Sequence, residues 1–142
     1  MLERFRLHYA PAVAAEMREE FPSGRECWRL AREGVLIEAV PQIEEVRDFG
    51  PGEWAAINLA LEHRDWVLLI DDRRPFLEAG RRGLRVLCTP VLAVELYSEG
   101  DLDAGQALGV LARLSALQTV SSDLLAPALA YMEAAWKERG RE

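Results

Sequence analysis

Four short strand-like runs, each followed by a helical pattern, constrain the fold of this chain more than any other feature of its sequence. Residues 5–9 alternate between apolar and polar side chains, and residues 35–40 form a second short run between glycine and proline. Residues 66–70 are continuously apolar, as in a central parallel strand covered on both faces, and residues 85–88 give a fourth strand. Because alternating strands and helices are joined by right-handed crossovers, the pattern predicts a three-layer α/β/α fold with a mainly parallel sheet.

The helical patterns lie between and after these strands. Pro11 is placed to begin a helix on which Val13, Met17 and Phe21 share one face. Further helices are predicted to begin at Ser23, Glu53, Arg73, Thr89, Asp101 and Ser122. The apolar stripe of the last helix consists of Leu125, Leu129, Met132 and Trp136.

The length and charge of the chain limit its class. With 142 residues, a single domain over 1–142 is expected. A net charge of −7 excludes a protein that coats nucleic acid by general electrostatic attraction, although a local site neutralised by cations remains compatible with it. We expect no membrane span and no signal peptide, because no apolar run approaches the roughly 20 residues that a span needs. Cys27 and Cys88 belong to no metal-binding or redox motif, which favours free thiols in a reducing cytoplasm.

Carboxylates follow the most apolar strand. Asp71 and Asp72 come directly after residues 66–70, and Glu53 follows Gly50-Pro51-Gly52 at the start of the preceding helix. Ligands of open parallel sheets bind outside the carboxyl ends of the strands, so this is where a site is expected. Two simpler roles compete: Asp72 suits the N-cap of the helix over residues 73–80, and Glu53 suits a first turn, where the helix dipole favours an anion.

The chemistry of these residues points to a hard metal ion. Sites built only from oxygen ligands favour Mg²⁺ or Mn²⁺ over Zn²⁺. Such ions activate water and stabilise the leaving oxygen in phosphodiester hydrolysis, and Arg73 and Arg74 are the candidates to bind the phosphates. An Asp-Asp pair at a strand end also occurs in receiver-like signalling domains, but there it follows the first strand, whereas here it comes late in the chain.

Three segments together resemble a branch of the PIN-domain family: GPGEWAAINLALE, WVLLIDDRR and GLRVLCTPVLAVELYSEG. The upstream LHYAPAVAAEM is similar to the strand, proline and helix of the same family. The resemblance implies a three-layer α/β/α fold with a parallel sheet. It also implies a Mg²⁺- or Mn²⁺-dependent ribonuclease, often the toxin of a toxin–antitoxin pair.

The resemblance also implies site residues. Matched by motif, Glu16 is the helix acid, Glu53 the Gly-Glu acid and Asp72 the strand-end acid, all catalytic, and Asp71 joins these three as a metal ligand. The implied partners are RNA, an antitoxin-like protein and further copies of the chain.

The chain departs from the family at its beginning. The family opens with a central strand that ends in an aspartate, and no such segment precedes Phe5. Cys88 also stands where the family usually has a glycine before Thr89. Three explanations are open: a start set too far downstream, a strand supplied by a partner chain, or a degenerate relative with weakened catalysis. In the last case the protein is a binding or assembly module, and unpaired strand edges favour self-association.

Overall fold

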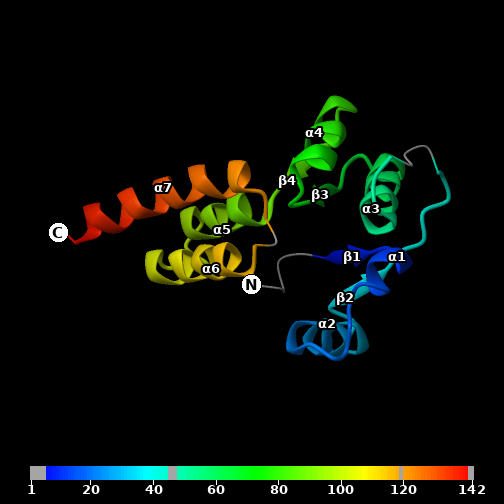
Figure 1. Cartoon of the computed structure of the whole chain (residues 1–142), viewed down its shortest axis with the longest axis horizontal. Coiled ribbons are helices and arrows are strands. Elements are labelled where there is room, and N and C mark those ends of the chain that lie inside the picture. Colours follow the sequence, from blue (N-terminus) through cyan, green and yellow to red (C-terminus); the bar gives the residue numbers. More distant parts are fainter. Residues whose placement is uncertain (1–5, 45–47, 119, 141–142) are drawn as a thin grey trace. The chain divides into compact units, whose positions relative to one another are not determined.

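The computed structural model describes residues 6–44, 48–118 and 120–140 (Figure 1). They belong to two compact units, residues 1–68 and residues 69–142, and each unit is described by itself. Strands alternate with helices along the chain and pair in parallel, so the predicted α/β class with parallel strands is confirmed. The described strands form two pairs, β1–β2 and β3–β4.

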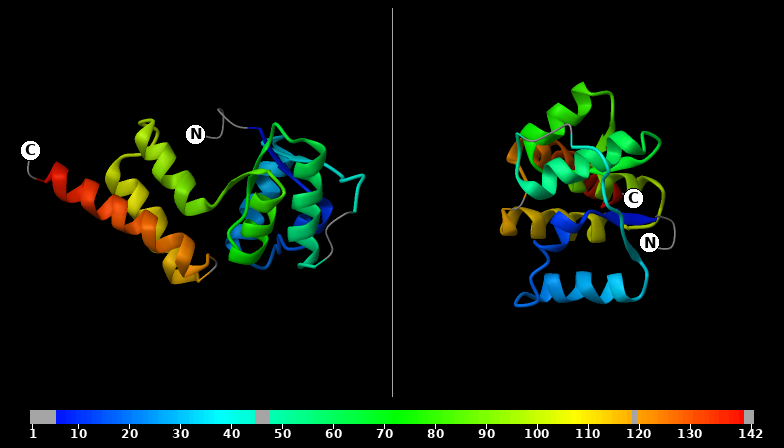
Figure 2. Two further views of the ribbon diagram at one scale, coloured as in Figure 1. Left: turned by 90° about the horizontal axis from the view of Figure 1, so that it is seen from above. Right: turned by 90° about the vertical axis from the view of Figure 1, so that its right-hand side faces the viewer.

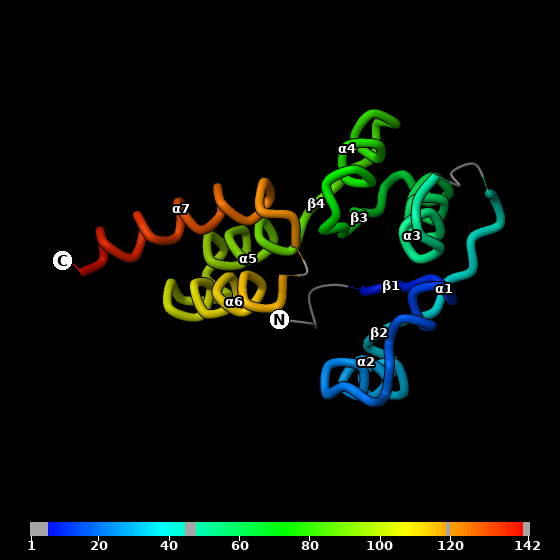
Figure 3. The backbone as a smooth tube through the Cα atoms, viewed as in Figure 1, coloured from blue at the N-terminus to red at the C-terminus, as the bar shows by residue number. Residues whose placement is uncertain are grey.

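The first unit holds one strand pair and three helices. Its elements are β1 (Leu7–Tyr9), α1 (Pro11–Ala14), α2 (Pro22–Arg32), β2 (Leu36–Glu38) and α3 (Pro51–Glu62). β1 and β2 are parallel, with Leu7 opposite Leu36 and Tyr9 opposite Glu38. Helix α2 packs against β2, and α3 packs against α1. The backbone trace in Figure 3 shows how the chain returns from α1 through a long turn into α2 before it enters β2.

The helix predicted from Pro11 to Phe21 is much shorter than expected. It ends at Ala14, and residues 15–20 form turns, because tertiary contacts compete for the backbone there. The indole Nε1 of Trp28 donates to the carbonyl of Met17 at 2.6 Å, and the Phe21 amide donates to the carbonyl of Arg18. Helix α2 then begins at Pro22 rather than Ser23, with Phe21 as its N-cap residue.

Helix α3 supplies most of the buried surface of the first unit. Pro51 stands in its first turn, where a missing amide N–H costs nothing. Ala55, Ile57, Leu59 and Ala60 are buried, and Asn58 is fully buried among them. The predicted start at Glu53 was two residues late.

A stack of three rings joins β1 to the loop after α3. Trp66 lies 3.8 Å from His63 and 4.2 Å from His8 between ring centroids, with interplanar angles of 8° and 22°. If both imidazoles stacked on the same face of the indole at these distances, their own centroids would lie no more than about 4 Å apart. Two rings that lie side by side in van der Waals contact need a larger separation than this. Trp66 is therefore sandwiched between the two histidines.

The second unit begins within a strand. β3 (Val67–Leu69) pairs with β4 (Arg85–Leu87), and the Ile70 amide extends the pairing by donating to the carbonyl of Leu87 at 2.9 Å. The prediction that residues 66–70 are covered on both faces is wrong. Leu68 and Ile70 are buried, but Val67 and Leu69 remain 48% and 46% exposed.

The core of the second unit lies between three helices. Helix α4 (Arg73–Arg81) precedes β4, and α5 (Thr89–Ser98), α6 (Ala104–Leu117) and α7 (Ser122–Arg139) follow it. Figure 2 shows these last three helices side by side, with the final turns of α7 extending beyond its neighbours. No helix in the described part of the chain is both long enough and apolar enough to cross a membrane.

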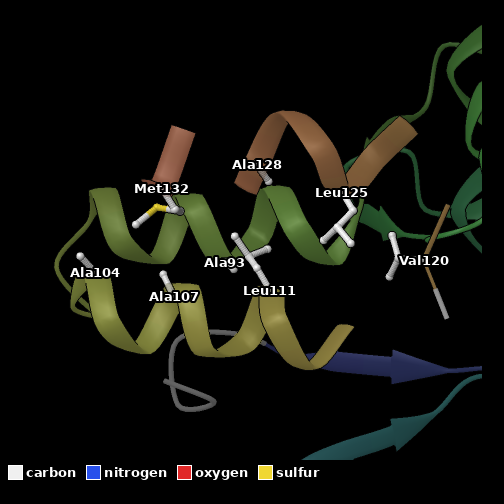
Figure 4. Packing of buried hydrophobic residues seen from close by; sticks show 8 residues of the cluster. All are labelled: Ala93, Ala104, Ala107, Leu111, Val120, Leu125, Ala128 and Met132. Atoms are coloured by element: carbon white, nitrogen blue, oxygen red, sulfur yellow. The ribbon is translucent and has the colours of Figure 1, made fainter. Parts of the chain in front are cut away.

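Small side chains allow these helices to approach closely. Figure 4 shows the cluster, which consists of Ala93, Ala104, Ala107, Leu111, Val120, Leu125, Ala128 and Met132. The predicted stripe of α7 is confirmed at Leu125 and Met132. It is wrong at Trp136, which is 55% exposed and only borders Gly105 at the start of α6.

Candidate functional site

Glu53 lies in the first turn of α3 and reaches back to the start of its own helix. Its Oε2 accepts a hydrogen bond from the Gly50 amide at 2.9 Å. This contact is one half of a capping box, and the positive end of the helix dipole stabilises the carboxylate further. The side chain is only half-buried, so the arrangement fixes a carboxylate in place while leaving it within reach of solvent.

Glu16 approaches the same turn from another segment. It lies in the turn after α1, not on a helix as predicted, and its carboxylate rests against Gly52 of α3. A Cβ atom at position 52 would lie 2.5 Å from Oε1 of Glu16, so with any larger residue there the exposed Glu16 side chain would have to shift. The first unit therefore brings Glu16 and Glu53, two of the predicted site residues, to the first turn of α3.

Asp71 has a different environment, in the second unit. Its Oδ1 accepts from the Thr89 amide at 2.6 Å, and its Oδ2 accepts from the Thr89 hydroxyl at 2.7 Å. The carboxylate thus caps α5 from outside the helix. The Asp71 carbonyl also accepts from the Ser121 amide at 3.3 Å, which ties this segment to the start of α7.

Asp72 and the two arginines lie at the start of α4. Asp72 is the N-cap residue of that helix, but its exposed side chain makes no capping hydrogen bond. The Arg73 amide donates to Ser121 Oγ at 3.1 Å, and its exposed guanidinium pairs with Asp123 at 3.1 Å. Arg74 is exposed next to it. Exposed ion pairs of this kind contribute little to stability, so Arg73 can exchange Asp123 for another anion at small cost.

Burial and charge also alter the thiol beneath this segment. Cys88 is 1% exposed and is the N-cap residue of α5. Burial raises the pKa of the Cys88 thiol, and the negative charge of Asp71 raises it further. Both cysteines are free, and Cys88 is set up as an inert core thiol rather than a nucleophile.

The carboxylates differ in how well they suit a metal ion. Among the described residues, no group of three or more His, Cys, Asp or Glu side chains is arranged to hold one. Mg²⁺ keeps several water ligands and needs only one or two protein carboxylates, so Glu16 and Glu53 are the candidate ligands in the first unit. Asp71 fits less well, since both of its oxygens already accept hydrogen bonds from Thr89.

Two features of the site were not predicted from the sequence. The first is Gly52, which has no side chain and so leaves space for the Glu16 carboxylate. The motif Gly-Pro-Gly-Glu could have indicated this, since a turn there does not need a second glycine. The second is a pocket beside Glu16 that Phe21 helps to line. The spacing of Phe21 predicts a position on a helix face, so the sequence did not indicate that Phe21 lines a pocket.

Comparison with known proteins gives one result. A sequence model described as a PIN domain matches residues 5–134, which is most of the chain. No curated protein and no solved structure gives a significant match. The family match agrees with the alternation of strands and helices and with acids placed at the start of α3 and after β3. This chain therefore belongs to the PIN-domain family.

Proposed function

We propose that this PIN-domain protein is a divalent-metal-dependent endoribonuclease of the toxin type, or a weakened relative of one. Membership of the family supports a nuclease-like role on nucleic acid. The observation that carries the finer proposal is the meeting of Glu16 and Glu53 at the first turn of α3. Carboxylates from two separate segments at one helix turn are typical ligands of a hard divalent cation.

The proposed roles follow from these contacts. Glu16 and Glu53 would hold Mg²⁺ or Mn²⁺, which when bound supplies a polarised phosphoryl oxygen and an activated water. The Gly50 amide keeps Glu53 oriented, and Gly52 keeps Glu16 close. Both carboxylates are ready to accept a proton from an attacking water.

Four further residues enter the proposal from the sequence motif. Asp72 is proposed as a third catalytic acid and metal ligand, and Arg73 and Arg74 as phosphate contacts. Asp71 is proposed as a ligand of lower occupancy, because Thr89 already uses its oxygens.

The test combines cleavage with metal binding. Purified protein is incubated with end-labelled single-stranded RNA in Mn²⁺, Mg²⁺ or EDTA, and thermal unfolding is followed at increasing Mn²⁺. We expect metal-dependent cleavage and a melting temperature that rises with Mn²⁺, since a ligand at tenfold its Kd stabilises by about 1.4 kcal/mol. Glu53→Gln and Glu16→Gln should abolish both effects.

The control is Glu38→Gln, an exposed acid of β2 in the same unit. It removes one negative charge without touching the site, so both effects should survive. Asp72→Asn is run beside it, and unchanged cleavage in that variant would remove Asp72 from the catalytic set. If Mn²⁺ at millimolar concentration leaves the melting temperature unchanged, the metal-dependent function is refuted.

A specific observation favours a second candidate, a catalytically inactive binding or assembly module. Val67 and Leu69 of β3 expose nearly half of their surface, and each described strand has a neighbour on one side only. Exposed apolar strands with open edges favour pairing with another chain, either a second copy or an antitoxin-like protein. Light scattering across a range of concentrations tests this: a monomer at every concentration, together with metal-dependent cleavage, would exclude the homo-oligomeric module.

The compartment remains a prediction. Free Cys27 and Cys88 are compatible with the reducing cytoplasm that the proposed toxin role requires.

A further inference from the structure

Helix α4 and the start of β4 concentrate positive charge in an otherwise acidic chain. Residues 73–85 contain five arginines and one acid, Glu78, which gives this segment a net charge of +4 in a chain whose net charge is −7. The arginines, called the arginine strip below, are Arg73, Arg74, Arg81, Arg82 and Arg85. The proposed function uses only the first two, so the charge of the other three has no role yet.

The exposed residues of α4 all lie on one side of the helix. They are Arg73, Arg74, Leu77, Gly80 and Arg81, and positions i, i+1, i+4, i+7 and i+8 follow a single helix face. Pro75 and Ala79 are the buried residues of the helix, which packs against β4. Arg85 is the first residue of β4 and is also exposed. The strip therefore continues from α4 into the next strand.

The ion pairs of the arginine strip leave positive charge in excess. Glu78 faces two arginines, since its Oε1 accepts from Arg82 Nε at 3.1 Å and its Oε2 lies 3.4 Å from a guanidinium nitrogen of Arg81. The Arg81 side chain is still 78% exposed, and Arg73, which pairs with Asp123, is 57% exposed. One carboxylate cannot neutralise two guanidinium groups, and exposed ion pairs contribute little to stability. Phosphates can therefore replace these acids at small cost.

Helix stability does not account for the positions of these arginines. Arg81 lies in the last turn of α4, where the helix dipole favours a cation. Arg73 and Arg74 lie in the first turn, where the same dipole disfavours one, and Asp72 makes no capping hydrogen bond there. Charges that are kept against a local preference are typical of functional surfaces.

The composition of the exposed face favours a nucleic-acid backbone over a protein partner. The cores of protein–protein interfaces are depleted in charged residues, whereas surfaces that bind nucleic acid are much more positively charged. In α4, all of which the structure describes, Leu77 is the one large apolar residue on the exposed face. A single apolar side chain between arginines is too little for the core of a protein interface.

The length of the strip suits more than one phosphate. Eight residues of helix separate Arg73 from Arg81, which is about 12 Å along the axis. Successive phosphates of one strand in a duplex lie about 3.4 Å apart along its axis, so the strip can contact several. Acids elsewhere in the chain that lie beyond about 8 Å are largely screened at physiological salt. The excess of charge is clearest over residues 81–85, which contain three arginines and no acid.

We propose that the arginine strip binds the sugar–phosphate backbone of single-stranded RNA by charge, without reading its bases. The proposal rests on the proposed function for the identity of the polymer, but arginine binds phosphate with neither metal nor cleavage. The three later arginines extend the phosphate contacts proposed for Arg73 and Arg74 along α4 and into β4.

The experiment measures RNA binding in EDTA as a function of salt. Fluorescence anisotropy of labelled single-stranded RNA is recorded between about 50 and 200 mM KCl, because each phosphate contact contributes about 0.7 to the slope of log K against log salt. The proteins are the wild type, Arg81→Lys, the double variant Arg81→Gln/Arg85→Gln, and Arg113→Gln. We expect the double variant to raise Kd about 10- to 100-fold at about 50 mM KCl and to reduce the slope by about 1.4.

Two variants control for effects other than the loss of charge at the strip. Arg81→Lys keeps the charge and should keep the slope. Arg113→Gln removes an exposed arginine of α6 in the same unit and should leave both Kd and slope unchanged. RNAs of different base sequence should lose affinity equally in the double variant.

Three results overturn the proposal. They are a wild type that does not bind RNA in EDTA, a double variant with unchanged Kd and slope, and poly-glutamate that binds as tightly as RNA with the same dependence on Arg81 and Arg85. The last result would assign the strip to an acidic protein segment. Cleavage in Mn²⁺ is measured separately on the same proteins. Binding that depends on the strip without any cleavage refutes the nuclease function and supports the strip, whereas cleavage with binding that ignores the strip does the reverse.

Discussion

The contact between Asp71 and Thr89 makes the sharpest prediction about stability. One half-buried carboxylate accepts two short hydrogen bonds, from the Thr89 amide and hydroxyl, at the start of α5. Hydrogen bonds to a charged group contribute about 1.5–3 kcal/mol each, and partial exposure of Asp71 favours the lower end of that range. Replacing Asp71 with alanine should therefore destabilise the protein by about 2–4 kcal/mol, with the helix dipole included.

Milder substitutions separate the two bonds. Asp71→Asn keeps an acceptor for the Thr89 amide but loses the charge, and the Thr89 hydroxyl must turn to accept from the new NH₂ group; we expect a cost of about 1 kcal/mol. Thr89→Val keeps the amide bond and loses the hydroxyl bond, at a similar cost. Because the two residues share one contact, the double variant should show a coupling of about 1–2 kcal/mol.

The assay is urea unfolding followed by far-ultraviolet circular dichroism, with Asp72→Ala as the control. Asp72 is adjacent, equally charged and makes no capping hydrogen bond, so its loss should stay within about 0.5 kcal/mol. If Asp71→Ala and Asp72→Ala are equally stable, the cap does not stabilise the second unit. A coupling near zero between Asp71 and Thr89 would lead to the same conclusion.

Three other predictions follow from single contacts. Gly52→Ala should weaken metal-dependent cleavage, because the new Cβ makes the Glu16 carboxylate shift, while circular dichroism shows an intact fold; unchanged cleavage would show that Glu16 need not lie against position 52. Trp66→Leu should destabilise the protein by about 1–3 kcal/mol, since it removes two ring stacks that contribute about 0.5–1.5 kcal/mol each. An unchanged midpoint of urea unfolding would show that the stacked rings do not stabilise the protein. Met132→Ala should lower the free energy of unfolding by about 2–5 kcal/mol, because it leaves a cavity in the three-helix core. The control Tyr131→Ala, at an exposed position, should lower it by less than about 0.5 kcal/mol, and equal losses would show that α7 packs differently.

The sequence allowed the fold class to be predicted where local pattern and tertiary structure agree. The alternation of Leu7 and Tyr9 with polar neighbours, and the stripe of Leu125 and Met132, describe faces that are indeed half-buried or buried. Such periodicity reports which side of an element meets the core, and it needs no knowledge of distant partners.

The same patterns failed where a distant group competes for the backbone. Val13, Met17 and Phe21 are spaced for one helix face, yet the Trp28 indole takes the Met17 carbonyl and α1 ends at Ala14. Spacing along the chain carries no information about a donor eleven residues away. The exposure of Phe21 could therefore not be predicted from the spacing of the apolar residues.

The candidate site divides along the same line. The sequence motif identified the acids, but their contacts are known only from the structure. Glu16 lies against Gly52, Glu53 accepts a hydrogen bond from the Gly50 amide, and Asp71 accepts one from the Thr89 hydroxyl. Asp71 accepts two hydrogen bonds from Thr89, so its carboxylate has a structural role. If these different contacts determine the roles of the acids, substitution of Glu16 or Glu53 should remove metal binding at little cost in stability. Substitution of Asp71 should leave metal binding intact and destabilise the protein.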